Sequence, residues 1–389
     1  MTSAAIIVGW GHTPFGRHDA LPLEALIHAA AQEALANAGL SGGDVDAVWL
    51  GHFNGGLVPD AFCSAMALGA DAELRFKPAT RCENACASGS AALYAAMNAI
   101  DAGRVKIALV VGVERMSGRD AAGVTAALGG AAYQPEEAGL SFPEIFARYA
   151  KAYAERFGDP SDAMARIAVK NHAHALDNPL AQMRRALDYD FCANVSEKNP
   201  LIAPPLRKTD CSLVSDGAAA VVLAHWNLHP DFRRAVRFRA AVQVSDLLPL
   251  SAKELARFEG PRRAFERAYA QARVGVEDLD FAEVHDCFTI AELLTVEAMG
   301  LAQPGDGPAI VREGLTTKGG SLPINLSGGL KAKGHPVGAT GVSMHVLAAR
   351  QLVGEAGAMQ VDGAQLGLCF NMGGGAVANY VSILEPLKV

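Results

Sequence analysis

The chain has few aromatic and few charged residues, and its composition excludes several classes of protein. Aromatic residues make up 6% and charged residues 19% of its 389 residues, while hydrophobic residues make up 50%, which excludes a disordered protein. No segment is long and apolar without glycine or charge, and no basic residue precedes the short apolar run near the N-terminus, so we predict neither a membrane span nor a signal peptide. A net charge of −7 argues against nucleic-acid binding. The composition predicts a soluble, cytoplasmic protein.

Cysteines are scattered and odd in number. None of the seven belongs to a CxxC pair, so the sequence predicts no zinc or other metal site. Free thiols are expected in a cytoplasmic chain of this length, and a free cysteine is by default a small buried hydrophobe. A catalytic role for any of them needs support from its neighbours. The seven are Cys63, Cys82, Cys86, Cys192, Cys211, Cys287 and Cys369.

Apolar runs that alternate with helical segments indicate an α/β fold. We expect strands at 5–8, 47–50 and 107–112, and helices at 23–38 and 88–102. Gly39 is a candidate to end the first helix. This alternation predicts a mostly parallel sheet that is covered by helices on both faces.

The pattern then recurs, which indicates two related α/β halves. An early helix leads through Asp44–Asp46 into an apolar strand, and a later helix leads through Asp278–Asp280 into another. Cys86 and His335 each open a helix rich in small residues, and each of these helices runs into an apolar strand. We therefore expect Cys86 and His335 at equivalent places in the two halves.

Between the halves the sequence changes character. We expect an N-terminal half at 1–230, with an inserted loop domain at about 118–207, and a C-terminal half at 231–389. Helical stretches at 142–157 and 162–174 alternate with loops in the inserted region.

Three basic pairs are candidates for a local anion-binding pocket in this acidic chain: Arg184–Arg185, Arg207–Lys208 and Lys331 with Lys333. Solvated surface charge is the default for each pair. His172 and His174 are likewise expected at the surface rather than at a metal.

Cys86 and His335 are the main catalytic candidates. A thiol at the start of a helix faces unpaired N–H groups and the positive end of the dipole, and both favour the reactive thiolate. The helix starts, if they face each other, would bring the thiol and the imidazole together as a nucleophile and its base. A buried structural cysteine and a loop histidine remain the alternatives.

Further candidates follow two other expected strands. His285 and Cys287 lie just beyond the run 282–284, where α/β folds place their sites. Gly373–Gly375 follow an apolar run and form either a tight turn or a backbone donor to an oxyanion.

Four motifs together resemble the thiolase family over nearly the whole chain. Asn84–Gly89 is similar to its nucleophile motif, Gly112–Ser117 to the strand end that follows, Asp216–Ala220 to its mid-chain strand and Gly334–Gly341 to its histidine loop. The resemblance implies two βαβαβαββ halves in a layered α/β/α/β/α core, with an inserted loop domain that binds coenzyme A.

Two departures resemble the sterol-carrier-protein-x branch of the thiolases. His285–Phe288 replaces the Asn-Glu-Ala-Phe motif of the two-cysteine thiolases, and Asn371 stands where they carry their second cysteine. Cys369 and Cys287 compete for the second acid/base role. Cys369 lies two residues before Asn371, a displacement of about 6–7 Å along a strand that proton transfer does not tolerate. The resemblance therefore favours Cys287, and Cys369 is expected to be a structural thiol.

The resemblance implies a two-step acyl transfer on coenzyme A thioesters, either thiolytic cleavage of a 3-ketoacyl-CoA or the reverse Claisen condensation. Cys86 would attack with His335 as its base. His285 and His335 would stabilise the enolate oxygen, and the N–H groups of Cys86 and Gly373 would hold the other oxyanion.

Two alternatives stay open: a ketosynthase-like acyltransferase of the same superfold, and a non-catalytic subunit of an acyl-CoA complex. The resemblance also implies a homo-oligomer, dimer or tetramer. Acyl-CoA and CoA would be substrates with no bound cofactor, and a small acyl-CoA-binding protein is a candidate partner.

Overall fold

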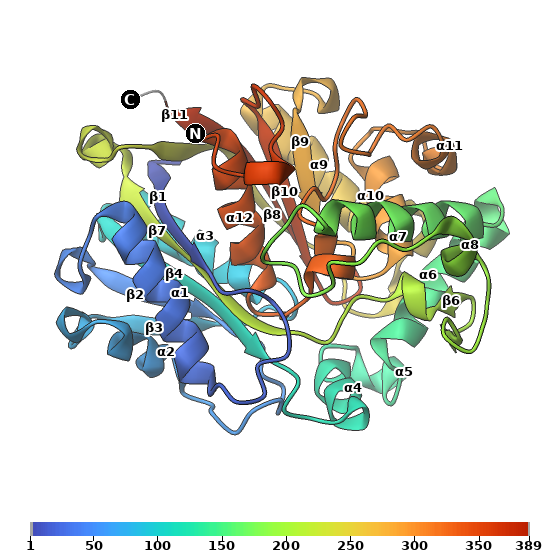
Figure 1. The fold of residues 1–389 in the computed structure, drawn as a ribbon, viewed down its shortest axis with the longest axis horizontal. Coiled ribbons are helices and arrows are strands. Elements are labelled where there is room, and N and C mark those ends of the chain that lie inside the picture. Colours follow the sequence, from blue (N-terminus) through green and yellow to red (C-terminus); the bar gives the residue numbers. More distant parts are fainter. Residues whose placement is uncertain (1–2, 388–389) are drawn as a thin grey trace.

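The computed structural model describes residues 3–387, and its centre is a sheet of nine strands (Figure 1). Their order across the sheet is β3-β2-β4-β7-β1-β8-β11-β10-β9. The strands are β1 (Ala5–His12), β2 (Ala47–Gly51), β3 (Ala79–Cys82), β4 (Ile107–Arg115), β7 (Asp216–His225), β8 (Ala235–Ser245), β9 (Phe281–Val284), β10 (Gly367–Gly373) and β11 (Ala378–Leu387). A separate two-stranded sheet pairs β5 (Leu201–Ala203) with β6 (Leu206–Arg207).

The strand order repeats itself. β2-β4-β7-β1 in the first half corresponds to β9-β10-β11-β8 in the second, and the two runs meet where β1 pairs with β8. The prediction of a mostly parallel sheet is wrong, because five of the eight neighbouring pairs are antiparallel. The short connection from β10 to β11 is one cause, since a tight turn joins only antiparallel strands.

Helices cover and separate the strands in layers, which confirms the predicted layered α/β fold. The helices are α1 (Leu23–Ala38), α2 (Cys63–Met66), α3 (Ser88–Asp101), α4 (Ala121–Gly129), α5 (Gln134–Glu137), α6 (Phe142–Phe157), α7 (Ser161–Ala175), α8 (Tyr189–Ala193), α9 (Glu259–Ala272), α10 (Thr289–Ala298), α11 (Gly307–Arg312) and α12 (Thr340–Leu352). α1 packs on β1 and β7, α9 packs on β8 and β11, and α3 and α12 pack against each other between the two halves. Within residues 3–387, no helix is both long and apolar enough to cross a bilayer.

The first helix shows how local sequence sets these boundaries. α1 buries Leu26, Ile27 and Ala30 on one face, as its apolar spacing requires. It ends at Gly39 in the left-handed conformation (φ 72°), so the predicted C-cap is confirmed.

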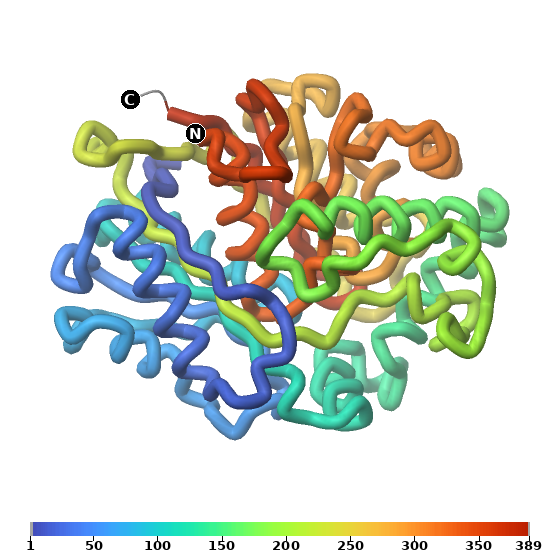
Figure 2. The backbone as a smooth tube through the Cα atoms, in the orientation of Figure 1, coloured from blue at the N-terminus to red at the C-terminus, as the bar shows by residue number. Residues whose placement is uncertain are grey.

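Figure 2 shows that the two ends of the chain lie on the same side of the molecule.

The segment between β4 and β7 forms α4 to α8 and the small sheet, on the right of Figure 1. Its helix α7 packs against α8, α10, α11 and the π-helix Gly329–Lys333. Because α7 is covered on several sides, His172 and His174 are buried, and the prediction that they lie at the surface is wrong. Lys331, Lys333 and Arg207 are buried as well, against expectation.

The close approach of α3 and α12 depends on residues without side chains. A Cβ on Gly89 would lie 2.7 Å from the carbonyl oxygen of Gly338 and 3.0 Å from the backbone nitrogen of Val342. A Cβ on Gly341 would likewise collide with Ser90. Both contacts involve the first turns of the helices, so the glycines bring the two helix starts together.

We predict that Gly89→Ala destabilises the protein. Alanine improves helix propensity by at most about 1 kcal/mol, whereas overpacking against a backbone that cannot move aside costs about 1–3 kcal/mol. The midpoint of urea unfolding should therefore fall. Gly319→Ala is the matched control because nothing lies within 4 Å of the added Cβ; an equal loss in both variants would contradict this account.

Candidate active site

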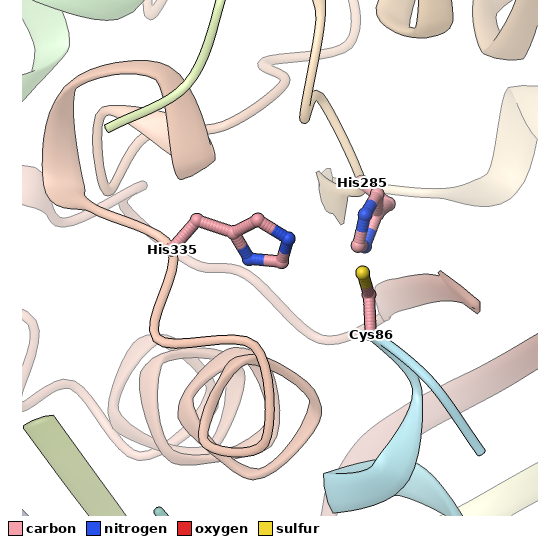
Figure 3. A group of neighbouring side chains, drawn as sticks. All are labelled: Cys86, His285 and His335. Carbon is pink, nitrogen blue, oxygen red and sulfur yellow. The ribbon is translucent and has the colours of Figure 1, made fainter. Parts of the chain in front are cut away.

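A cavity of about 210 Å³ lies where the ends of β4, β9 and β10 meet the starts of α3 and α12. The sulfur of Cys86 and a ring nitrogen from each of His285 and His335 all lie within 4.8 Å of one another (Figure 3). Its walls are mostly apolar, and they include Met116, Val124, Leu128, Phe142, Phe146, Phe288 and Val337. The structure thus brings together three residues that are up to 249 positions apart in the chain.

A strained turn presents Cys86 to this cavity. Ala85 adopts the left-handed conformation at φ 51°, which is unfavourable for a residue with a Cβ. Ser88 stabilises the turn, since its Oγ donates to the carbonyl of Ala85 and accepts from the N–H of Asn84. This turn directs the side chain of Cys86 away from the axis of α3 and into the cavity.

The thiol of Cys86 rests in its neutral form. Burial raises its pKa to about 12, although the N–H groups of Gly374 and of Cys86 itself face the sulfur and act in the opposite direction. The expectation that the helix start favours the thiolate is therefore wrong at rest, because desolvation outweighs these donors. A neutral thiol at this position would need a base to remove its proton before it could act as a nucleophile.

The ring of His335 has an orientation that suits a base. Its Nδ1 lies 2.7 Å from Oγ1 of Thr340, whose only proton goes to the carbonyl of Pro336. Nδ1 must therefore carry the ring proton, and Nε2 is a bare lone pair with no hydrogen-bond partner among residues 3–387. Burial, and next the charge of Lys333, lower the pKa of His335 to about 3, so the ring is neutral.

His285 has the opposite tautomer. Asn371 donates from Nδ2 to the carbonyl of Cys86 at 3.3 Å and to Nδ1 of His285 at 2.9 Å, while its Oδ1 accepts from Ser90. The carbonyl of Cys86 can only accept a hydrogen bond, so the amide atom of Asn371 beside it must be the nitrogen. The same nitrogen donates to Nδ1 of His285, which is therefore an acceptor. Nε2 of His285 therefore carries the proton, and burial holds the pKa of the ring well below its usual value.

The two competing cysteines have different surroundings. Cys287 lines the cavity just beyond β9, and burial raises its pKa well above the usual value. Cys369 lies in β10, and its thiol is directed at the carbonyl of Met344 in α12. Burial raises the pKa of Cys369 as well, but in the described chain this residue does not line the cavity.

The glycine turn after β10 also reaches the cavity, but through Gly374. Its N–H faces the sulfur of Cys86, and Gly374 lines the cavity. Gly373, the donor expected from the sequence, is the last residue of β10 and packs against the turn at Asn84. The N–H groups of Gly374 and Cys86 both face this sulfur, so they are the candidate donors to the oxygen of a carbonyl that the sulfur attacks.

One thiol and two imidazoles are also a ligand set for zinc. One feature of the described site disfavours a metal: Nδ1 of His285 accepts from Asn371, so Nε2 of this ring holds a proton and offers no lone pair to an ion. The set is better suited to moving protons than to holding an ion.

Two family models match the chain. The model for the thiolase N-terminal domain matches residues 5–227, and the model described as thiolase C-terminal domain-like matches residues 243–386. The chain belongs to the thiolase family.

Relatives of this thiolase cover almost all of the chain. The acetyl-CoA acetyltransferase of Methanothermobacter thermautotrophicus is 35% identical over 372 residues, which are 95% of this chain and 96% of the relative. Sterol carrier protein 2 of Homo sapiens is 33% identical over 393 residues, which are 95% of this chain and 70% of the relative.

Solved structures share the fold of this thiolase at lower identity. The Ltp2-ChsH2(DUF35) aldolase superposes with a TM-score of 0.84 at 22% identity, covering 99% of this chain and 98% of the other. Human mitochondrial 3-ketoacyl-CoA thiolase in complex with CoA superposes with a TM-score of 0.76 at 17% identity, covering 100% and 99%.

A buried ion pair supports the histidine loop of this thiolase. The Glu114 carboxylate accepts hydrogen bonds from the N–H groups of residues 53–54 and of Gly338, and it lies 3.0 Å from Nε2 of His52. Burial alone would lower the pKa of His52, but Glu114 and the hydrogen bond with Cys63 raise it to about 9. Sequence reasoning gave Glu114 no role, and its position at the end of an apolar strand was the only signal.

We predict that Thr340→Val slows acylation of Cys86 by about tenfold to a hundredfold, because His335 loses the acceptor that fixes its tautomer. Thr340→Ser keeps the hydroxyl and should restore most of the rate. Mass spectrometry of the Cys86 peptide after rapid quenching measures both rates. Equal rates in the two variants would show that the hydroxyl has no such role.

Proposed function

We propose that this thiolase-family acyltransferase transfers acyl groups of coenzyme A thioesters through the sulfur of Cys86. One observation carries the proposal: a bare Nε2 on His335 and a protonated Nε2 on His285 face the same thiol in an apolar cavity. Acyl transfer needs a base at the nucleophile and a donor at the substrate oxygen, and the two tautomers supply one each.

In the first step His335 accepts the proton of Cys86 at Nε2 as the sulfur attacks the substrate carbonyl. The N–H groups of Cys86 and Gly374 stabilise the negative oxygen that forms. When the tetrahedral intermediate collapses, the bond between carbonyl carbon and leaving group breaks, and the acyl group stays on Cys86. The leaving group is a coenzyme A thiolate for a simple thioester, which regains the proton from His335.

For a 3-ketoacyl-CoA the leaving group of the first step is instead the enolate of acetyl-CoA. Cys287 protonates the α-carbon of this enolate and becomes a thiolate, while the Nε2–H of His285 donates to the enolate oxygen. In the second step free CoA attacks the acyl group on Cys86 and gives its proton to Cys287; the acyl-CoA is released, and the sulfur of Cys86 regains its proton from His335. Condensation is the reverse of these steps, so the Cys287 thiolate then removes the α-proton. The high pKa of Cys287 supports a protonated resting thiol, which is the form that cleavage of a 3-ketoacyl-CoA uses first.

Two other functions predict different results. A ketosynthase-like acyltransferase would form the acyl-enzyme but would not cleave acetoacetyl-CoA with free CoA. A non-catalytic subunit would do neither. Nε2 of His285 and Nε2 of His335 have no hydrogen-bond partner within the part of the chain that the structure describes, which counts against such a subunit.

We also propose that the chain acts as a homodimer that pairs through β3. This strand ends the nine-stranded sheet, so its outer edge is free to bind a second copy. Phe62 and Phe76 flank it at 75% and 84% exposure, which is high for large apolar side chains. The nucleophile turn follows β3 directly, so pairing would also brace Cys86. Sedimentation equilibrium of Phe76→Asp against the unmodified chain tests the pairing.

A small acyl-CoA-binding partner protein remains part of the proposal. Its support is the shared fold with the Ltp2-ChsH2(DUF35) aldolase, whose name includes a DUF35 component. Co-purification with a tagged chain tests it. The cytoplasmic location stays a prediction from the sequence.

The direct test of the function is the covalent intermediate. Incubation with acetyl-CoA should add an acetyl mass to the peptide that contains Cys86, and Cys86→Ala should lose both the adduct and turnover of acetoacetyl-CoA. His335→Ala should slow acylation about a hundred- to ten-thousandfold. An adduct on another cysteine, with Cys86→Ala still active, would overturn the assignment.

We predict that Cys287→Ala separates the two half-reactions. The variant should still form the acyl-enzyme from acetyl-CoA, yet lose exchange of the acetyl α-protons with deuterium and all carbon–carbon bond turnover. Cys369→Ala should lower thermal stability by removing buried volume, with little change in rate. The reverse pattern would assign the second acid/base role to Cys369.

A further inference from the structure

The turn that joins β10 to β11 has an unusual backbone. Gly374 and Ala376 both adopt the left-handed conformation, at φ 64° and φ 55°, and this conformation is unfavourable for a residue with a Cβ such as Ala376. The N–H of Gly374 faces the sulfur of Cys86. A strained backbone persists only where surrounding contacts hold it, so other parts of the chain must hold this turn in place.

Two side chains from different elements meet at the carbonyl of Gly375, the central residue of this turn. The hydroxyl of Tyr149 in α6 donates to the carbonyl oxygen at 2.8 Å. The ammonium group of Lys253, in the segment between β8 and α9, donates to the same oxygen at 2.8 Å. Because a carbonyl oxygen has two lone pairs, the two donors occupy both and fix the direction of this carbonyl.

Tyr149 is itself held firmly by its neighbours. It is 1% exposed, its ring stacks on Phe146 with the centroids 5.2 Å apart, and it meets the ring of Phe258 edge-on at 5.8 Å. Phe146 also lines the cavity at Cys86. The helix α6 therefore contributes one side chain to the wall of the active site and another to the glycine turn.

Lys253 is held by the loop that carries it. Burial lowers the pKa of Lys253 to about 8, against the opposing effects of Asp246 and Glu137, so the ammonium form predominates at pH 7 and its bond to Gly375 is charge-assisted. Glu137 also accepts from the backbone N–H three residues before Lys253. The N–H of Asp246 donates to the carbonyl of Val377, which follows the turn. This loop is therefore bound both to α5 and to the turn.

We propose that Lys253 and Tyr149 are positioning residues for acyl transfer, which hold the N–H of Gly374 toward the sulfur of Cys86 by fixing the turn at Gly375. The proposal rests on the proposed function, in which this N–H stabilises the negative oxygen of the tetrahedral intermediate. Such a donor acts strongly because it is already oriented, so a turn that could move would lose much of the effect. Neither Lys253 nor Tyr149 lines the cavity within the described residues, so both act through the turn.

The double variant Tyr149→Phe/Lys253→Met tests the proposal in single-turnover acylation of Cys86 by acetyl-CoA. It removes both donors and keeps an aromatic ring and an aliphatic chain of similar length. Deleting an oxyanion donor outright costs roughly a hundred- to a thousandfold in rate, so a loosened donor should cost about tenfold to a hundredfold. The half-saturating concentration of acetyl-CoA should stay nearly unchanged, because the interaction is made only in the transition state.

Tyr153→Phe/Lys151→Met is the matched control on the same helix. Tyr153 is also 1% exposed, and its hydroxyl donates to Glu297 rather than to the turn, while Lys151 is exposed. The control removes the same two kinds of group and should acylate at the unmodified rate. Hydrogen–deuterium exchange of the peptide that covers residues 373–377 reports the turn without any substrate, and it should be faster in the double variant than in the control.

Slower acylation together with faster exchange in the double variant supports the proposal. Unchanged acylation, unchanged exchange, or an equal loss of rate in the control overturns it. If the double variant does not fold, Tyr149→Phe against Tyr153→Phe decides in the same way. If the unmodified chain forms no acyl-enzyme, the proposed function fails, and exchange alone then decides whether the two side chains hold the turn.

Discussion

The whole site depends on one contact, in which the first turns of α3 and α12 touch backbone to backbone. Gly89 lies against Gly338, and Gly341 lies against Ser90, with no room for a side chain at any of the glycines. Because Cys86 precedes one helix and His335 precedes the other, this contact determines how far the thiol is from the imidazole. Glu114 holds the same loop from the other side through the N–H of Gly338. Gly89, Gly338 and Gly341 are therefore structural requirements for bringing Cys86 and His335 together.

Burial then sets the chemistry. It keeps both imidazoles neutral and the thiol protonated, so charge appears in the cavity only while a substrate reacts. His335 donates to Thr340 from Nδ1 and His285 accepts from Asn371 at Nδ1, so the two rings have opposite tautomers. Nε2 of His335 can therefore accept a proton, and Nε2 of His285 can donate one. In a cavity with mostly apolar walls, such oriented groups act more strongly than mobile charges would.

The pairing of Cys86 with His335 could be predicted from the sequence, because the internal repeat puts both residues at equivalent helix starts. In the sequence, Asn371 stood out only because it replaces the second cysteine of the two-cysteine thiolases. Its hydrogen bonds to the carbonyl of Cys86 and to the ring of His285 could not be predicted, because both partners are distant in sequence. The thiolate was expected from local dipoles, but the pKa of Cys86 depends on the desolvation that the whole fold imposes. Lys331 and His172 were expected at the surface because helical periodicity gives no sign of an element that is covered on every side.

The central claim is that the fold holds His335 and His285 as neutral rings of opposite tautomer. Nitrogen NMR of the chain labelled with ¹⁵N in its histidine rings tests it most directly, because protonated and bare ring nitrogens have widely separated shifts. His335→Gln and His285→Gln assign the signals. At pH 7 the account predicts a proton on Nδ1 of His335 and on Nε2 of His285. Two rings of the same tautomer, or either ring protonated on both nitrogens, would contradict it.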